Sequence, residues 1–237
     1  MIKEIKNFIR KTILGYDIST YFFTNSGEDA ILQSIFSKKL SRKEKGFFVD
    51  VGAYHPYKAS NTYLFYINGW TGINIDARPG SMKAFNQVRP KDINLEIGVG
   101  EKEDTLLYYF IDDNSSMNSF SKKFLLNTGM YKHVKKEIPV KVLPLNNILN
   151  QYSSEFDRID ILNIDVEGFD MEVVKSNDWS KFRPSVIVIE LNCKSIHDLK
   201  DNETAKYLCD LGYDIIAKNV VIRDVASVFF VDKKFEY

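Results

Sequence analysis

Residues 47–56 constrain the fold of this 237-residue chain more than any other stretch. An apolar run ends in Asp50 and Gly52, and a polar turn leads into a short helical pattern. A second apolar run then closes at Asp76. Strand, turn, helix and strand in this order are typical of a βαβ unit whose first turn holds a nucleoside-containing ligand. We therefore expect an α/β fold with its ligand at that turn.

The rest of the chain continues this alternation with one interruption. Further strands are expected at residues 73–76, 93–99, 159–165 and 186–190, and a closing strand pair, antiparallel in one interpretation, at 213–217 and 226–231. Helices are expected at residues 63–67, 82–88, 145–152, 171–175 and 204–211. Residues 104–143 break the pattern with a strand, a polar loop at 112–121, a basic helical stretch at 122–137 and a second strand. An insertion of this length usually carries specificity in an α/β enzyme.

Composition excludes several classes of function. Lys and Arg number 32 and so do Asp and Glu, so no net charge attracts the chain to nucleic acid. No apolar run reaches the roughly 18 residues of a membrane span. Cys193 and Cys209 lack metal-ligand spacing and are too few for a disulfide scaffold, which fits a reducing cytoplasm.

Residues 1–24 are expected to form an amphipathic helix ahead of a main domain at 25–237. Isoleucines recur at helical spacing, with basic residues mostly opposite them: Ile2, Ile5, Ile9 and Ile13 against Lys3, Lys6, Arg10 and Lys11. Such a helix could lie on a membrane surface, or its apolar stripe could dock on the domain or on a second subunit in a homodimer. The second interpretation is favoured, because so short a stripe binds lipid weakly.

Acidic residues close four of the expected strands. They are Asp50, Asp76, Asp165 and Glu190. In open α/β sheets ligands bind beyond the carboxyl ends of the strands, so these acids are candidate site residues. Glu28, at the start of an earlier helical stretch, has two equal interpretations: it stabilises the helix dipole, or it binds a cationic amine.

The first turn argues against a phosphate-bearing ligand. It has one glycine, and Pro56 donates no N–H, whereas a dinucleotide fingerprint needs three glycines. Asp76 lies 24 positions after Gly52, where an acid takes ribose hydroxyls in such folds. S-adenosyl-L-methionine satisfies these conditions because it carries adenosine without phosphate. Asp50 and Gly52 would hold its amino acid end and Asp76 its ribose, while Gly98 in the third strand would line the adenine.

Several segments together resemble the FkbM family of S-adenosylmethionine-dependent methyltransferases. The matching segments are residues 26–29, 48–56, 60–63, 69–76, 160–168 and 183–184, with Glu190. The resemblance implies a Rossmann-like class I methyltransferase with a seven-stranded, mostly parallel sheet and an antiparallel last strand. It implies O-methylation, often of sugars in bacterial surface glycans such as capsule or lipopolysaccharide, or of secondary metabolites. The cofactor residues so implied are Asp50, Gly52 and Asp76, with Glu28, Asn61 and Thr62 as weaker matches and the turn residues Ala53, Tyr54 and Ala77 beside them.

Methyl transfer to a hydroxyl needs a group that removes the proton. His55 is the first candidate base, because it sits in the turn beside the expected methyl group and has an unperturbed pKa of about 6.5. Its alternative role is to order the turn before Pro56. Asp165 and Glu167 are the competing bases. With Glu190 they could also bind a divalent metal, which is the less favoured alternative because ordinary substrate hydrogen bonds explain the same acids.

The acceptor is expected to be a sugar or a nucleotide sugar. Five lysines of the insertion could clamp its phosphate, although a charge run is more often a solvated face: Lys122, Lys123, Lys132, Lys135 and Lys136. The predicted function is therefore O-methylation of a sugar or glycan precursor. A nicotinamide-dependent sugar oxidoreductase and a non-catalytic nucleoside-binding domain are the alternatives.

Overall fold

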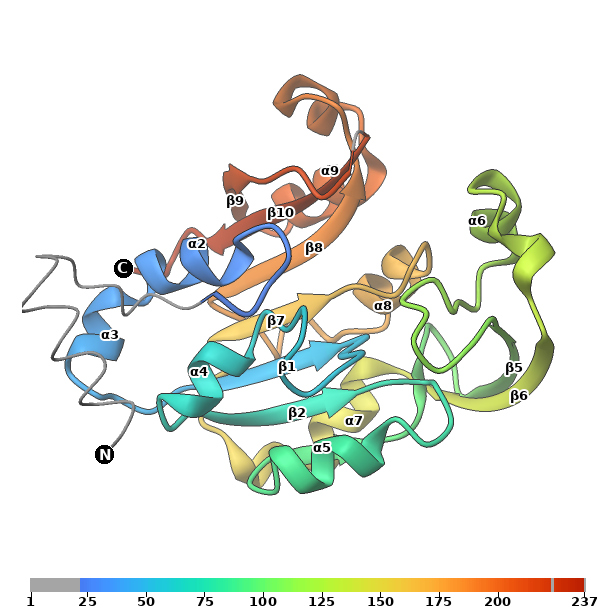
Figure 1. Ribbon diagram of the computed structural model, residues 1–237. Coiled ribbons are helices and arrows are strands. Elements are labelled where there is room, and N and C mark those ends of the chain that lie inside the picture. The colour runs from blue at the N-terminus through green and yellow to red at the C-terminus, as the bar shows by residue number, and fades with distance from the viewer. Residues whose placement is uncertain (1–21, 223, 237) are drawn as a thin grey trace, which may run out of the picture.

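The computed structural model describes residues 22–222 and 224–236. The amphipathic helix expected within residues 1–24 therefore lies almost wholly outside the described residues. At the centre is a seven-stranded sheet with the order β3-β2-β1-β7-β8-β10-β9 (Figure 1). Its strands are β1 Phe47–Val51, β2 Thr71–Ile75, β3 Ile93–Leu95, β7 Ile161–Ile164, β8 Val186–Asn192, β9 Tyr213–Lys218 and β10 Val225–Asp232. β10 pairs antiparallel with β8 and β9, and the other pairs of this sheet are parallel, so the expected fold class is confirmed.

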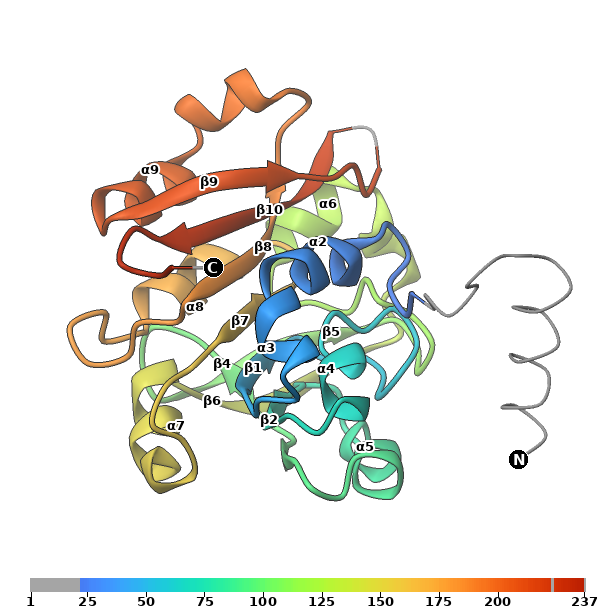
Figure 2. The same cartoon turned by 90° about the vertical axis from the view of Figure 1, so that its left-hand side faces the viewer.

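Helices cover both faces of this sheet (Figure 2). They are α2 Glu28–Ile35, α3 Ser37–Ser41, α4 Tyr63–Ile67, α5 Met82–Val88, α7 Leu145–Gln151, α8 Asp170–Lys175 and α9 Glu203–Asp210. A further helix, α6 Lys122–Asn127, packs within the insertion. Side chains of β1 alternate between two apolar cores, because successive residues of a strand point to opposite faces. Phe48 packs with residues of α2 and α4, whereas Val49 and Val51 pack with residues of α7, α8 and α9.

The register of the parallel strands brings the predicted site residues to one edge. Val51 of β1 pairs with Ile75 of β2 and with Ile164 of β7. The next residues along each strand, Gly52, Asp76 and Asp165, therefore leave the sheet side by side. We call this the carboxyl edge of the sheet.

The insertion builds a second sheet beside the carboxyl edge. It holds β4 Gly98–Val99, β5 Asp104–Phe110 and β6 Lys136–Leu143 in the order β4-β6-β5. The single strand expected at residues 93–99 is therefore wrong: β3 ends at Leu95, and Gly98 joins the small sheet. Gly98 allows that change because a side chain there would collide with Phe120 and Val142, 2.6 and 2.9 Å from the added carbon.

The basic stretch 122–137 is not one helix. Ser121 caps α6 by accepting a hydrogen bond from the Phe124 N–H at 3.1 Å. The helix ends at Asn127, and Gly129 adopts a left-handed φ of 72° before a short 3₁₀ turn, Met130–His133. Gly27, which has φ 86°, likewise precedes the first residue of α2. Glycine adopts this conformation without steric cost, so it ends or begins helices.

Candidate functional site

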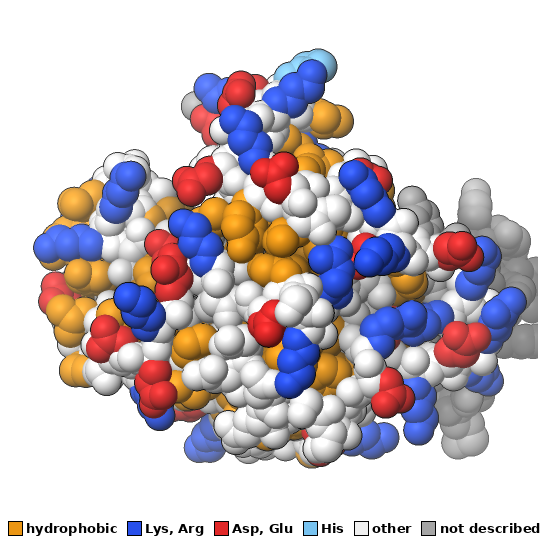
Figure 3. Space-filling view, turned by 180° about the vertical axis from the view of Figure 1, so that it is seen from behind, with side chains coloured by type: hydrophobic (Ala, Val, Ile, Leu, Met, Phe, Trp, Pro, Cys, Tyr) orange, Lys and Arg blue, Asp and Glu red, His pale blue; other side chains and the backbone are white. Residues whose placement is uncertain are grey.

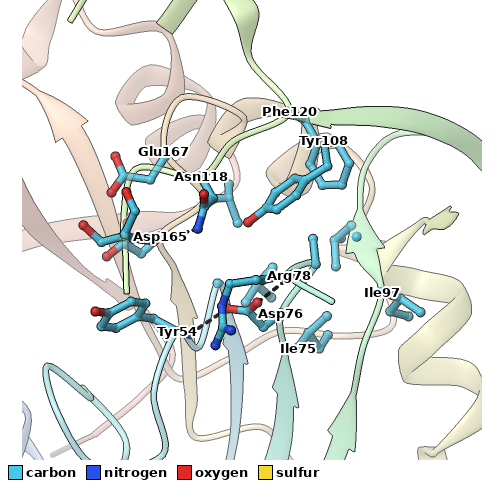
Figure 4. Close-up of a pocket in the computed structure, with 18 residues that line it drawn as sticks. Tyr54, Ile75, Asp76, Arg78, Ile97, Tyr108, Asn118, Phe120, Asp165 and Glu167 are labelled. Carbon is cyan, nitrogen blue, oxygen red and sulfur yellow. Dashed lines mark hydrogen bonds between the residues drawn. The ribbon is translucent and has the colours of Figure 1, made fainter. Parts of the chain in front are cut away.

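A pocket opens at the carboxyl edge, between the main sheet and the insertion (Figure 4). Clefts beyond the carboxyl ends of parallel strands are where open α/β sheets bind their ligands. Its wall combines residues that follow β1, β2 and β7 with residues of the insertion: Val51, Gly52, Tyr54, Ile75, Asp76, Ala77, Arg78, Ile97, Gly98, Val99, Tyr108, Ser115, Ser116, Asn118, Phe120, Asp165, Val166 and Glu167.

The pocket floor depends on glycine at position 52. Gly52 has φ +83°, and a side-chain carbon there would lie 1.7 Å from the carbonyl oxygen of Asp165. Real carbon and oxygen atoms do not approach so closely, so no other residue fits without separating β1 from β7. Position 52 thus keeps two strand ends in contact beneath the pocket.

The turn uses its own backbone donors internally. The N–H groups of Gly52 and Ala53 donate to the Ile75 carbonyl at 2.9 and 3.0 Å. The Tyr54 N–H donates to Asp76 Oδ2 at 2.9 Å, and the His55 N–H donates to the Ala53 carbonyl at 2.5 Å. A phosphate-binding turn must instead point free N–H groups at its ligand, so this turn is not suited to a pyrophosphate.

Asp76 stands in the pocket wall with a fixed orientation. Besides the Tyr54 N–H, its carboxylate accepts the Arg78 N–H at 2.8 Å. Burial raises its pKa, and these backbone hydrogen bonds oppose the rise. Each carboxylate oxygen keeps a second lone pair, so Asp76 can still accept from ligand hydroxyls. Tyr54, Ala77 and Gly98 line the same pocket, whereas Ala53 is buried with Met82 and Phe85.

Asp50 does not line the pocket. Its carboxylate is buried below the turn, where it accepts hydrogen bonds from Thr62 Oγ1 at 2.7 Å and Asn163 Nδ2 at 2.9 Å. Asn61 donates to Asn163 Oδ1 at 2.8 Å, which extends the network. Asp50, Asn61 and Thr62 therefore form a buried hydrogen-bond network that supports the turn, and no contact with a ligand follows from their positions.

Glu28 also lies outside the pocket wall. It accepts hydrogen bonds from Ser227 Oγ at 3.0 Å and from the Ser26 N–H at 3.2 Å. These contacts connect α2 to β10, so the side chain of Glu28 is engaged in packing the helix against the sheet.

Arg89 is a buried cation that sequence reasoning missed. It is fully buried and pairs with Asp92, with Nε and Oδ2 2.8 Å apart. It also donates to Thr62 Oγ1 at 3.0 Å, which links it to the Asp50 network. The aromatic rings of Phe48 and Tyr66 flank the guanidinium. The sequence signal was an arginine three residues before an aspartate, next to a strand.

Replacing Arg89 with methionine is expected to destabilise the fold by about 3 kcal/mol, because Asp50 and Asp92 would lose their buried counter-charge. Chemical denaturation measures this directly. Arg42→Met is the control, since Arg42 is 71% exposed and pairs with Glu44 only at 3.6 Å. An exposed pair of this kind contributes less than about 1 kcal/mol. Equal destabilisation by the two substitutions would contradict the assigned role of Arg89.

His55 faces its own turn. Its Nδ1 accepts hydrogen bonds from the N–H groups of Tyr57 and Lys58 at 3.3 and 3.1 Å. Burial, Lys58 and Arg78 lower the pKa of His55. A neutral imidazole that accepts at Nδ1 carries its proton on Nε2, so no nitrogen is free to take a proton. His55 is not in the pocket wall either.

His55→Asn is therefore expected to lower the turnover number by less than about tenfold, well below the 10²–10⁴-fold typical of a lost general base. The pH profile of turnover should keep its acidic limb. A methyl-transfer assay from pH 5.5 to 9 checks both points. A loss above a hundredfold together with the disappearance of that limb would restore His55 as the base.

Carboxylates gather on one wall of the pocket, which we call the acid wall. Asp165 and Glu167 line it, and Glu190 and Asp170 lie close enough to interact with them. Burial, followed by mutual repulsion, raises the pKa of Glu167 to about 8 and that of Glu190 to about 7. The pKa of Asp165 is also raised well above its usual range. The structure thus brings together two of the three predicted catalytic residues.

Backbone strain and hydrogen bonds position Glu167. It has φ +54°, a conformation rare for residues other than glycine. Ser119 Oγ donates to its carbonyl at 2.8 Å. Asp170 accepts the N–H groups of Val166 and Gly168 at 3.3 and 3.1 Å, which closes the loop after β7. Glu167 therefore reaches the pocket from a turn that is held at both ends.

The sequence profile of the methyltransferase FkbM domain matches residues 50–215. That range includes the pocket floor, the acid wall and the whole insertion.

The chain belongs to the FkbM methyltransferase family.

A comparison with solved structures matches other methyltransferases. The methyltransferase FkbM of Methylobacillus flagellatus KT is 13% identical, covering 78% of this chain and 43% of its own length, with a TM-score of 0.48. The METTL16 methyltransferase domain is 13% identical over 98% of this chain and 79% of its own, with a TM-score of 0.44. The fibrillarin pre-rRNA processing protein of Methanococcus jannaschii is 12% identical over 87% and 76%, with a TM-score of 0.44. This chain spans less than half of the first of these proteins, and no curated protein matches it.

The insertion of this FkbM-family methyltransferase closes over the pocket. Tyr54 Oη donates to the Asn114 carbonyl at 2.9 Å, and Arg78 pairs with Asp113 at 3.5 Å. Tyr108 and Phe120 add an aromatic wall, with ring centroids 4.9 Å apart. The polar loop of the insertion also lines the pocket, through Ser115, Ser116 and Asn118. Arg78, Tyr108 and Phe120 had no motif that marked them in the sequence.

Two of the insertion lysines contact groups of the insertion itself. Lys122 lies 4.9 Å from the Tyr131 ring centroid, and Lys135 Nζ is 3.7 Å from Asp112 Oδ2. On the face shown in Figure 3, acidic and basic side chains are intermingled, without a broad field of one sign. Over the described ranges, no helix is long and apolar enough to cross a membrane, and no group of three His, Cys, Asp or Glu residues is placed to hold a metal ion.

The acid wall makes stability depend on pH in a defined direction. The ordinary pKa values of these carboxyl groups, 3.8 to 4.5, apply in the unfolded chain, whereas in the folded chain the pKa of Glu190 is about 7 and that of Glu167 about 8. Between these two ranges the folded chain binds more protons than the unfolded chain. Stability therefore falls as pH rises through that window. We expect a lower melting temperature at pH 8.5 than at pH 6. In Glu167→Gln the difference should shrink, and an unchanged difference would contradict the assignment.

Proposed function

We propose that this FkbM-family enzyme binds S-adenosyl-L-methionine in the pocket and methylates a hydroxyl of a sugar or glycan precursor. The observation that carries the proposal is the hydrogen bonding of the turn after β1. Its N–H groups donate to acceptors within the protein, and one of them holds Asp76 in the pocket wall. That combination favours a ribose without an adjoining pyrophosphate. It disfavours the nicotinamide-dependent alternative, which needs free N–H groups at the same turn.

The residues present fit this cofactor. Asp76 can accept hydrogen bonds from ribose hydroxyls, and Ile97, Val99 and Phe120 offer apolar surface to the base. Arg78 Nε is buried without a hydrogen-bond partner among the described residues, so it can donate to a ligand oxygen. Asp165 and Glu167 suit a ligand with cationic groups. When bound, the cofactor supplies a methyl group activated by a sulfonium.

The chain's own residues provide alignment and a proton acceptor. Tyr54, Asp113 and Ser119 hold the insertion loop over the pocket, which limits water and fixes the acceptor. Such alignment contributes about 7 kcal/mol or more to lowering a barrier. Glu167 takes the hydroxyl proton as carbon–oxygen bond formation proceeds, because its raised pKa makes its carboxylate a stronger base. Asp165 sits beside it and is the second candidate.

The wider setting follows from the family resemblance. A glycan precursor made in the cytoplasm, such as one for a capsule or lipopolysaccharide, is the proposed acceptor. The polar loop at residues 112–121 lines the pocket through Ser115, Ser116 and Asn118, which can hydrogen-bond sugar hydroxyls.

Calorimetric titration tests the cofactor, and product analysis tests the acceptor. S-adenosylhomocysteine should bind in the micromolar range or tighter, while NAD should not bind measurably. Incubation with S-adenosylmethionine and a panel of sugars and nucleotide sugars should give a product heavier by one methylene. NAD binding without S-adenosylhomocysteine binding would overturn the proposal. Loss of turnover after exhaustive chelation, restored by a divalent cation, would instead establish the metal alternative.

A further inference from the structure

Tyr108 lies in the wall of the pocket with its hydroxyl group unpaired. The residue belongs to β5 of the insertion, is 7% exposed and lines the pocket. Its Oη makes no hydrogen bond to any residue of the described ranges. Buried tyrosine hydroxyl groups usually have a hydrogen-bond partner, because an unpaired buried polar group is unfavourable. The missing partner is therefore one that a ligand can supply.

Packing fixes the direction of this hydroxyl group. The Tyr108 and Phe120 rings lie with their centroids 4.9 Å apart at an interplanar angle of 60°. Figure 4 shows the hydroxyl group pointing from the insertion into the pocket, toward the side where Asp76 and Arg78 lie. The group is thus positioned before a ligand binds, so little side-chain freedom is lost when it forms a hydrogen bond.

The Tyr108 hydroxyl group is suited to donate a hydrogen bond and not to act as a base. Burial raises its pKa, the negative charge of Asp76 raises it further, and Arg78 opposes the rise. The group therefore keeps its proton near neutral pH. A ligand that pairs with this O–H must bring an acceptor atom.

Asp76 and Arg78 define what else such a ligand must bring. The Asp76 carboxylate accepts backbone N–H groups from Tyr54 and Arg78, and its remaining lone pairs can accept only from donors of a ligand. Arg78 Nε is a second buried donor without a partner in the described part of the chain. A ligand between these groups must therefore donate and accept at neighbouring atoms. A hydroxyl group does both, because it has one donor and two acceptor lone pairs.

We propose that Tyr108 is a specificity-determining residue, whose Oη donates to a ribose hydroxyl group that in turn donates to Asp76. The inference rests on the proposed function, because the ribose is that of S-adenosyl-L-methionine. It makes the site selective for ribose over deoxyribose, since a ligand without that hydroxyl group leaves both Tyr108 and Asp76 without a partner. Sites that hydrogen-bond a ligand hydroxyl group reject the analogue that lacks it for this reason.

Calorimetric titration with S-adenosylhomocysteine and with its 2′-deoxy and 3′-deoxy analogues tests the inference. The unchanged chain should bind one of the deoxy analogues at least about tenfold more weakly than S-adenosylhomocysteine. Tyr108→Phe should weaken the binding of S-adenosylhomocysteine by about tenfold. It should not weaken the binding of the analogue that lacks the contacted hydroxyl group, because that analogue has no such contact to lose.

Tyr109→Phe is the matched control. Tyr109 is the next residue of β5 and is 9% exposed, but it packs with Ile111 and Leu125 in the core of the insertion. This variant should bind all three ligands like the unchanged chain. Tyr108→Phe should keep the melting temperature of the unliganded chain, because its hydroxyl group has no partner to lose there. A tyrosine with a purely structural role would instead lower the melting temperature when its hydroxyl group is removed.

The possible failures are distinguishable from one another. If the unchanged chain does not bind S-adenosylhomocysteine, the proposed function is overturned and this inference with it. If S-adenosylhomocysteine binds but both deoxy analogues bind equally well, or Tyr108→Phe loses no affinity, the inference alone is overturned. It is also overturned if Tyr108→Phe weakens all three ligands equally, or if it raises only the KM of the methyl acceptor, which would assign the hydroxyl group to the acceptor.

Discussion

Gly52→Ala is expected to destroy the pocket and to destabilise the fold by more than about 4 kcal/mol. The added methyl carbon would lie 1.7 Å from the Asp165 carbonyl oxygen, and backbone cannot yield as a flexible side chain can. The left-handed φ of +83° adds about 1–2 kcal/mol of strain. This clash can be relieved only if the ends of β1 and β7 separate, and that separation would remove the floor of the pocket. Thermal unfolding and titration with S-adenosylhomocysteine measure the two effects.

Gly69→Ala separates the clash from the backbone strain. Gly69 has a similar φ of +90°, but an added carbon there meets no atom within 4 Å. This control should therefore cost only the strain, about 1–2 kcal/mol, and should leave ligand affinity unchanged. If Gly52→Ala behaved like Gly69→Ala in both measurements, the close approach of the two strands would not be essential to the site.

Glu167→Gln is expected to lower the turnover number by about 10²–10⁴-fold, the usual contribution of a general base. Glutamine keeps the size of the side chain and can still form hydrogen bonds, but it cannot take a proton. Since Glu167 has a pKa of about 8, turnover in the unchanged enzyme should rise with pH through that region. In the variant this limb should disappear, while affinity for S-adenosylhomocysteine should change by less than about tenfold.

Asp165→Asn and Glu172→Gln complete the comparison. Asp165→Asn should lower turnover less than Glu167→Gln if Glu167 is the base, and more if the roles are exchanged. Glu172 is a half-buried acid of α8 that does not line the pocket, so Glu172→Gln should retain turnover within a few-fold. Full turnover in both pocket variants would remove the carboxylates from the mechanism.

Much of the sheet could be predicted because its strands are local, apolar and closed by acids. The run Val186–Asn192 is buried along most of its length, and the carboxyl-edge residues Gly52, Asp76 and Asp165 follow directly from parallel pairing. The division of residues 93–99 between two sheets could not be predicted. It depends on Gly98 meeting Phe120 and Val142, which are distant in sequence.

Site residues that follow directly from strand ends could be predicted from the sequence. Residues whose orientation depends on tertiary packing could not. Asp50 belongs to the strongest motif, yet its side chain points below the turn to Thr62 and Asn163, because alternate residues of β1 face opposite sides of the sheet. His55 loses its free nitrogen to two backbone donors that only the folded turn presents. Tyr108 and Phe120 reach the pocket through the insertion's topology, which no local pattern reveals.

A crystal structure of the complex with S-adenosylhomocysteine tests the central claim most directly. We predict that the adenosyl group occupies the pocket, that its ribose hydroxyls contact Asp76, and that its sulfur faces the wall formed by Asp165 and Glu167. Density for the ligand at another place on the chain, or a pocket closed by its own side chains in the complex, would contradict this account.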